Sequence, residues 1–196
     1  MIASDMGGNL APQRPFKRAA PISNGKLDVW TALTDSLTGL ANRRAFNGRL
    51  AEEIAHADRY GTELTLAMLD LDHFKAYKDT HGHVAGDHAL DRVASALQRL
   101  MRDSDIAFRY GGEEFAILMA HTGVAEAARV TSRMLTNFRT EEHLSTPGAG
   151  EQCLTLSAGV APHTPGQQAT SFIESADAAL YAAKRAGRNR CVSLAA

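Results

Sequence analysis

Two pairs of acidic residues carry the most suggestive chemistry in this sequence. Asp70 and Asp72 lie at the end of an apolar run over 64–72, and Glu113 and Glu114 follow two glycines. Neighbouring carboxylates repel each other, so a divalent cation is expected to compensate them. A site made only of oxygen ligands suits Mg²⁺, which usually binds together with substrate phosphates. The sequence therefore indicates a metal-dependent reaction at phosphate.

The residues around the two glutamates predict a buried hairpin. Residues 106–110 alternate like a half-buried strand, and residues 115–119 form the continuous apolar run of a strand covered on both faces. Gly111 and Gly112 between them predict a tight turn, because glycine adopts positive φ without steric cost. We therefore expect both carboxylates at the tip of a rigid hairpin.

The remaining periodicities predict an α+β fold. Apolar stripes and breakers place helices at 43–60, 73–80, from Gly86-Asp87 to 100, at about 123–139 and at 169–186, and further strands at 64–72, 153–161 and 190–194, with a polar loop at 140–150. The core order is then β-α-β-β-α-β with helices added at the start and the end. This is the ferredoxin-like arrangement, an antiparallel central sheet with helices packed on it.

Composition places the chain among ordinary globular domains. It has 196 residues, 44% hydrophobic and 22% charged, and only two cysteines, which are expected to be reduced. A net charge of −1 gives no broad attraction to nucleic acid or a membrane surface. No apolar run approaches the roughly 18 residues of a membrane span, and no signal peptide is evident, so a cytoplasmic location is expected.

The N-terminal end differs from the rest. Residues 1–26 are rich in Gly and Pro and predict a flexible tail or linker, while 27–196 form the expected domain. Leu27, Trp30 and Leu33 have helical spacing and predict a short lead-in helix.

Five segments together resemble one known family. They are DSLTGLANRR at 35–44, DLDHFK at 70–75, GHVAGD at 82–87, RYGGEEF at 109–115 and AKRAGRN at 183–189. In this order and spacing they are similar to the GGDEF domain of diguanylate cyclases, in its GGEEF variant, and the match covers 35 to about 192. The resemblance implies a palm-like nucleotidyl-cyclase fold with the same core.

The resemblance also implies roles for the acidic residues. It places Mg²⁺, or Mn²⁺, on Asp70, the carbonyl of Leu71 and Glu113, with Glu114 in support. Glu113 is also implied as the base for an attacking 3′-hydroxyl, so Glu113 and Glu114 are the expected catalytic residues.

Substrate contacts follow from the same resemblance. Lys75, Lys184 and Arg188 are expected against a triphosphate, with His73, Phe74 and Leu90 as further contacts. Asp87 is expected to read a guanine edge, although an Asp there also suits a helix N-cap. At position 78 the family usually has Asn, and this chain has Lys78. Lys78 is expected near Asp87, where an ion pair would occupy the carboxylate.

A second binding site is implied upstream of the hairpin. Arg102 and Asp105 have the spacing of the family's inhibitory RxxD site, and an Arg fork suits a guanine edge or phosphate. The plain alternative is a helix-end salt bridge, which contributes little. Arg133 is a candidate helper.

The function that the resemblance implies is diguanylate cyclase. Two GTP molecules would give cyclic di-GMP and two pyrophosphates, with product feedback, in at least a transient antiparallel homodimer. The alternative is an impaired domain that only binds GTP or cyclic di-GMP, which Lys78 favours and the acidic residues oppose. An enzyme making a different cyclic dinucleotide is a weaker third possibility, because Asp87 is present.

Overall fold

The computed structural model describes residues 32–145 and 153–194, except for the side chains of 142–145. The strands are β1 (Ala41–Asn42), β2 (Leu64–Leu71), β3 (Asp105–Arg109), β4 (Glu114–Ala120), β5 (Leu156–Pro162) and β6 (Cys191–Ser193). The helices are α2 (Arg43–Tyr60), α3 (Phe74–His81), α4 (His83–Leu100), α5 (Val124–Ser145) and α6 (Ala169–Arg185).

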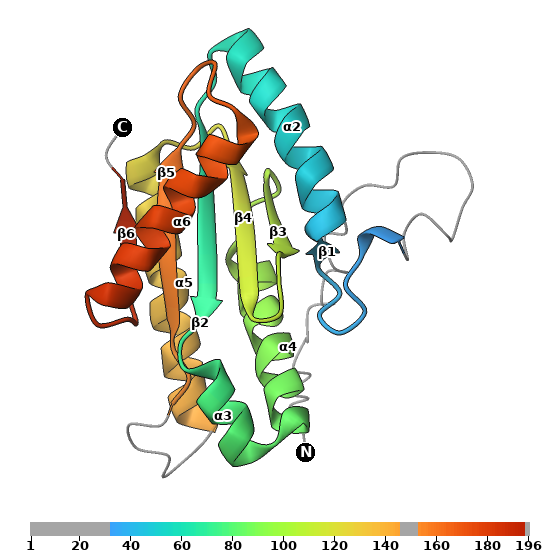
Figure 1. The fold of residues 1–196 in the computed structure, drawn as a ribbon, viewed down its shortest axis with the longest axis vertical. Helices are drawn as coiled ribbons and strands as arrows, with labels where there is room; N and C mark the ends of the chain where they lie inside the picture. The colour runs from blue at the N-terminus through green and yellow to red at the C-terminus, as the bar shows by residue number, and fades with distance from the viewer. Residues whose placement is uncertain (1–31, 146–152, 195–196) are drawn as a thin grey trace, which may run out of the picture.

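These strands form one mixed sheet in the order β1-β3-β4-β2-β5-β6 (Figure 1). The four inner strands, β3, β4, β2 and β5, run antiparallel to one another in this order. The short edge strands differ, because β1 pairs with β3 and β6 pairs with β5 in parallel. The predicted ferredoxin-like β-α-β-β-α-β core is confirmed, with a parallel strand added at each edge.

Helices cover both faces of the sheet. Residues of α2 and α6 pack with one set of strand side chains, including Met68, and residues of α4 and α5 pack with the other, including Leu69 (Figure 1). Successive strand residues point to opposite faces, so both kinds of position in β2 must be apolar. Every residue of β2 is buried accordingly. The acidic end of β2 therefore projects from a rigid, fully packed strand.

Helix α2 has a well-defined residue at each end. The side chain of Asn42 accepts hydrogen bonds from the backbone N–H groups of Arg44 and Ala45, and Gly61 ends the helix at φ 63°. Both are the residue types preferred at helix ends. The predicted span of 43–60 is confirmed.

Other boundaries were wrong. Helix α4 begins at His83 rather than at Gly86, because Gly82 at φ 86° turns the chain earlier. Asp87 consequently lies inside the helix, and its interpretation as an N-cap is incorrect. Helix α5 continues to Ser145 through part of the expected polar loop. An ion pair at 2.5 Å between Arg99 Nη2 and Glu141 Oε2 joins α4 to these last turns of α5.

Some predictions lie outside the described residues. They include the tail over 1–26, Leu27 and Trp30 of the lead-in helix, and residues 146–152 of the loop. Strand β5 begins at Leu156, three residues later than predicted. Among the residues that the structure describes, no helix is both long and apolar enough to cross a membrane.

Candidate active site

An acidic cavity opens where β2 and β4 lie side by side. Asp70 is the register partner of Glu114, and the β3–β4 turn lies beside the end of β2 (Figure 1). A cavity of about 280 Å³ is lined by Asp70, Gly112, Glu113 and Glu114. The structure thus brings together the three carboxylates that the sequence singled out. The carbonyl of Leu71 is at the same strand end, where the backbone N–H of Leu71 donates to the carbonyl of Glu113 (N–O 3.3 Å).

The turn itself is built differently from the prediction. The N–H groups of Tyr110 and Gly111 both donate to the carbonyl oxygen of Glu114, at 2.9 and 3.1 Å. Neither Gly111 nor Gly112 has positive φ, so the predicted reason for these glycines was wrong. At Gly111 a Cβ would lie 2.5 Å from the Glu114 carboxylate. That carboxylate is the end of a flexible side chain, so a side chain at position 111 would displace the Glu114 carboxylate rather than the turn.

Burial and neighbouring negative charges raise the pKa values of Asp70 and Glu113. Burial raises the pKa of Asp70, against the opposing charges of Lys184 and Arg188. Burial also raises the pKa of Glu113, and the charge of Asp70 adds to this rise. Asp70 Oδ1 lies 2.9 Å from Lys184 Nζ. The charges of Lys184 and Arg188 are thus insufficient to offset the effect of burial on Asp70.

The donor set fits a hard cation that shares its ligands with a substrate. The described residues contain no group of three or more His, Cys, Asp and Glu side chains that could hold a metal ion by themselves. Mg²⁺, however, usually binds through one or two carboxylates and takes its other ligands from water and phosphates. Asp70 and Glu113, whose pKa values are raised by burial and by repulsion, are the pair that such an ion would stabilise.

Helix α3 presents free backbone N–H groups next to the end of β2. His73 is its N-cap at φ 57°, and no side chain caps the helix. The first N–H groups of a helix have no partner within it, and they bind anions well. Lys75 is exposed on the first turn, whereas Phe74 is 2% exposed and belongs to the core. A phosphate contact of Phe74 would therefore use its backbone.

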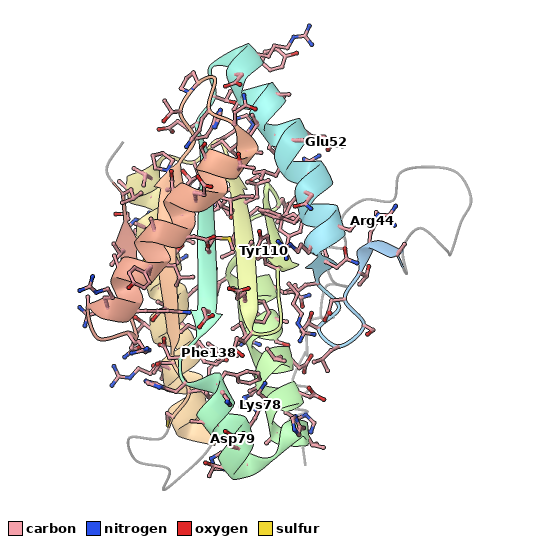
Figure 2. The ribbon with its side chains drawn as sticks, viewed as in Figure 1. Arg44, Glu52, Lys78, Asp79, Tyr110 and Phe138 are labelled. Atoms are coloured by element: carbon pink, nitrogen blue, oxygen red, sulfur yellow. The ribbon has the colours of Figure 1, made fainter. Side chains whose placement is uncertain are left out.

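Lys78 does not behave as expected. No ion pair joins Lys78 to Asp87 in the described part of the chain, which corrects that prediction. Instead Lys78 Nζ lies 4.5 Å from the centre of the Phe74 ring, and a Cβ on Gly86 would lie 2.7 Å from Lys78 Cγ. Figure 2 shows Lys78 on α3. The stem of Lys78 thus fills the space between α3 and α4.

The expected guanine contacts lie on the neighbouring helix. Asp87 is exposed on α4, one residue after Gly86. Leu90 is only 3% exposed and packs in the core on the α4–α5 side of the sheet. Asp87 is therefore accessible to a ligand, while Leu90 mainly supports the helix.

The RxxD residues are joined to the next helix. The backbone N–H of Arg102 donates to Asp105 Oδ2 (3.1 Å), but its guanidinium donates to Glu126 Oε1 (2.7 Å). A salt bridge between the Arg102 and Asp105 side chains, the plain alternative, is therefore not formed. Glu126 also pairs with Arg129, and hydrogen bonds from Arg129 contribute most to the lowered pKa of Glu126. Arg133 is exposed on the same face of α5, seven residues after Glu126.

Arg109 is a residue of the site that the sequence did not single out. Its Nη1 donates to both oxygens of Asp35 (2.9 and 3.1 Å), and its Nη2 donates to the carbonyl of Gly112 (2.9 Å). Burial acts to raise the pKa of Asp35, but hydrogen bonds from Thr38 and Arg109 hold it below its usual range. Arg109 thus ties the segment before β1 to the acidic turn. The sequence signal for this contact was Asp35 in the first of the five segments and Arg109 directly before the hairpin turn.

Asp72 is close in sequence to Asp70 but does not line the cavity. It is 3% exposed and accepts hydrogen bonds from Thr155, Ser157 and Asn189. The hydrogen-bond partners of Asp72 are therefore Ser157 in β5, Thr155 directly before β5 and Asn189 in the loop after α6.

Curated proteins similar to this chain are diguanylate cyclases. Diguanylate cyclase VdcA of Vibrio cholerae is 42% identical over 83% of this chain and 47% of its own length. Diguanylate cyclase DgcP of Pseudomonas aeruginosa is 41% identical over 81% of this chain and 23% of its own length. The chain thus spans less than half the length of these relatives.

Solved structures agree in fold and sequence. The coiled coil and GGDEF domain of DgcB from Caulobacter crescentus, in complex with c-di-GMP, has a TM-score of 0.79 and 38% identity, covering 85% of this chain and 88% of that one. The active GGEEF domain of a diguanylate cyclase from Vibrio cholerae has a TM-score of 0.71 and 31% identity, covering 80% and 99%. The family model described as "Diguanylate cyclase, GGDEF domain" matches residues 32–190. The chain therefore belongs to the GGDEF domain family of diguanylate cyclases.

Proposed function

We propose that this chain is a diguanylate cyclase that condenses two GTP into cyclic di-GMP and two pyrophosphates, with Mg²⁺ or Mn²⁺. The observation that carries this proposal is the acidic cavity over Asp70, Glu113 and Glu114. Lys184 lies against this cavity, and the uncapped N-terminus of α3 follows the same strand end. Carboxylates for a cation beside donors for phosphate are the parts that phosphoryl transfer requires.

The reaction forms two bonds and breaks two. Each 3′-oxygen attacks the α-phosphorus of the other nucleotide, and each bond between the α-phosphorus and the α,β-bridging oxygen breaks to release pyrophosphate. When bound, the metal ion polarises the phosphoryl oxygens and offsets the charge of the leaving group. Glu113, whose raised pKa favours proton uptake, accepts the proton of the 3′-hydroxyl. The triphosphate is held by Lys75, Lys184, Arg188 and the backbone N–H groups after His73.

Incubating the purified chain with GTP and Mg²⁺ and separating the nucleotides by chromatography tests the proposal. Cyclic di-GMP and pyrophosphate are expected in a ratio of one to two. Unchanged GTP at high protein concentration would contradict it. GTP that binds but does not react would instead support the competing function as a nucleotide-binding module, which Lys78 in place of the usual Asn favours.

Assembly leads to a further prediction. The symmetric product has two bonds to make, so two loaded domains must face each other, and we propose an antiparallel homodimer. If this dimer is transient, the specific activity rises with protein concentration, because encounter of two domains limits the rate. Initial rates over a wide dilution series measure this dependence. A flat specific activity would point to a stable dimer or to a protein without cyclase activity.

We propose that Arg102, Asp105 and Arg133 bind the product. Arg102→Ala is then expected to weaken cyclic di-GMP binding and relieve product inhibition, while initial rates change little, because Arg102 lies at the opposite end of β3 from the acidic turn. Calorimetry with cyclic di-GMP measures the affinity. Arg99→Ala is the matched control, because Arg99 also makes an exposed ion pair across α4 and α5. Equal product affinity in the parent and in Arg102→Ala would refute the assignment.

Lys78→Asn is expected to improve kcat/KM for GTP, mainly through KM. An Asn side chain offers a donor and an acceptor to a guanine edge, whereas an ammonium only donates. One neutral hydrogen bond contributes about 0.5–1.5 kcal/mol, so the improvement is roughly threefold to tenfold. Steady-state kinetics with GTP provide the measurement. Lys78→Met, which keeps the stem over Gly86 and removes the charge, is the control. Unchanged kinetics in Lys78→Asn would mean that Lys78 has no influence on base binding.

A further inference from the structure

Asp72 forms a buried hydrogen-bonded junction between three separate parts of the chain. Its Oδ1 accepts from Ser157 Oγ (2.7 Å), and its Oδ2 accepts from Thr155 Oγ1 (2.7 Å) and from the backbone N–H of Asn189 (3.0 Å). Its own N–H donates to the carbonyl of Thr155 (2.9 Å). The residue is 3% exposed. A buried carboxylate with three donors in place is a strong and specific tie.

The loop that Asp72 holds has an unfavourable backbone conformation. Gly187, Arg188 and Asn189 follow one another at φ 109°, 60° and 48°. Residues other than glycine in the left-handed region are destabilising, and they persist only where surrounding contacts fix them. The N–H of Asn189, the third residue of this run, is the group that donates to Asp72. The hydrogen bond to Asp72 is therefore made directly after Arg188, the residue of this run for which the left-handed conformation is least favourable.

The same loop bears Arg188, a cationic residue close to the acidic cavity. Arg188 lies three residues after the end of α6, and its N–H donates to the carbonyl of Ala183 (3.1 Å). Lys184, on the last turn of α6, contacts Asp70 at 2.9 Å. Since Ala183 directly precedes Lys184, the hydrogen bond from Arg188 to Ala183 fixes the backbone of Arg188 beside the residue that contacts Asp70. Asp72 thus connects the strand that bears Asp70 with the loop that bears Arg188.

We infer that Asp72 is a positioning residue, which holds the loop 187–189 so that Arg188 faces the triphosphate of the bound nucleotide. This inference rests on the proposed function, because it takes GTP as the ligand. Asp72 itself contacts neither the substrate nor the cavity. Its effect on binding passes through the backbone of Asn189.

Two substitutions at this position separate the hydrogen bond from the charge. In Asp72→Asn the amide oxygen can take the place of Oδ2 and accept from Asn189, while the amide NH₂ donates to Ser157, whose hydroxyl also accepts. The tie to the loop is then kept without the charge. Asp72→Ala removes every acceptor and releases the loop. We therefore expect Asp72→Asn to keep the nucleotide affinity that Asp72→Ala loses.

The binding test uses 3′-deoxy-GTP with Mg²⁺, because this nucleotide keeps the triphosphate but has no hydroxyl to cyclise. Calorimetry should show about tenfold weaker binding for Asp72→Ala and for Arg188→Ala, and nearly parent affinity for Asp72→Asn. Adding Arg188→Ala to Asp72→Ala should weaken binding by less than about threefold more, because residues that act together are not additive. Full additivity would overturn the inference.

Hydrogen exchange at the amide of Asn189 tests the tie without any nucleotide. Exchange should be faster in Asp72→Ala and unchanged in Asp72→Asn. Thr65→Val is the control for stability, because it removes another buried hydrogen bond of β2, from Thr65 Oγ1 to the carbonyl of Thr122 (2.6 Å), at the opposite end of the strand. Thr65→Val should change neither the exchange nor the affinity.

A milder variant protects the test against misfolding. Ser157→Ala removes one of the two hydroxyls that orient Asp72, and it should shift exchange and affinity in the same direction by a smaller factor. Unaltered hydrogen exchange at the amide of Asn189 in both Asp72→Ala and Ser157→Ala would contradict the role of Asp72 in holding the loop. A parent chain that binds no 3′-deoxy-GTP would overturn the proposed function, and with it the substrate role of Arg188, whatever the exchange shows.

Discussion

Asp70→Asn and Glu113→Gln are each expected to lower the rate of cyclisation about a thousandfold or more, with the fold intact. Each substitution removes one anionic ligand from a site that must bind a strongly hydrated cation, and charge stabilisation by a metal ion contributes several kcal/mol to the transition state. Initial rates with GTP and Mg²⁺ measure the loss. Asp79→Asn is the matched control, because Asp79 is an exposed acid on α3 away from the cavity lining (Figure 2). A rate equal to that of the parent in either variant would contradict the assignment of Asp70 and Glu113 as metal ligands.

The same variants should not destabilise the metal-free protein. The pKa of Asp70 and the pKa of Glu113 are raised in the folded chain, chiefly by burial. Stability from such groups is present below their unfolded pKa values and is lost as the pH rises through the folded values. Burial makes the ionised form of both groups a cost to the fold, so a neutral Asn or Gln keeps Tm equal or raises it. Thermal unfolding should show this, and added Mg²⁺ with nucleotide should stabilise only the parent.

The raised pKa values also set the direction of the pH dependence. Metal binding requires both carboxylates to be ionised, so activity falls on the acid side as the pH drops through their folded pKa values. Because both values are raised, this fall occurs above the usual range of Asp and Glu. A profile of kcat/KM against pH, at a fixed Mg²⁺ concentration below saturation, shows the position of this limb, because saturating metal displaces the protons and moves the limb to lower pH.

Gly159→Ala is expected to have the largest effect on stability. Gly159 lies in β5 where α6 crosses the sheet, and an added Cβ would meet the backbone nitrogen of Leu180 and the carbonyl oxygen of Ala176, and would lie 2.6 Å from the carbonyl carbon of Ala179. Backbone atoms cannot move aside as a side chain does, so the helix must shift. We expect a loss of about 3 kcal/mol or more in the free energy of unfolding. For a domain of this size Tm would fall by about 6–12 °C.

Gly48→Ala provides the matched control with the opposite sign. Gly48 is exposed within α2, has ordinary helical φ, and an added Cβ there would meet nothing within 4 Å. Alanine is favoured over glycine inside a helix by about 1 kcal/mol, so this variant should be more stable. Denaturant unfolding of both variants measures the difference. A Gly159→Ala protein as stable as the parent would contradict the close approach of α6 to β5.

The amino-acid sequence by itself determined the elements and the acidic site. The run 64–71 is apolar except for Thr65 and Asp70 because both faces of β2 are covered. Asn42 and Gly61 end α2 by local hydrogen bonding and backbone preference. These are short-range causes, which a pattern of residues records directly. Asp70, Glu113 and Glu114 were recognisable because a strand end and a hairpin turn are local features too.

Only the tertiary structure decided which residues face one another. Arg109 reaches back to Asp35 across 74 positions, and Asp72 reaches Asn189 across 117. Lys78 packs on Gly86 and Phe74 instead of pairing with Asp87, because the gap between α3 and α4 is apolar where its stem lies. Sequence spacing cannot report such contacts, since they depend on how the helices dock on the sheet and on the direction of each side chain. The need for glycine at 159 is of the same kind, because it arises only when α6 crosses β5.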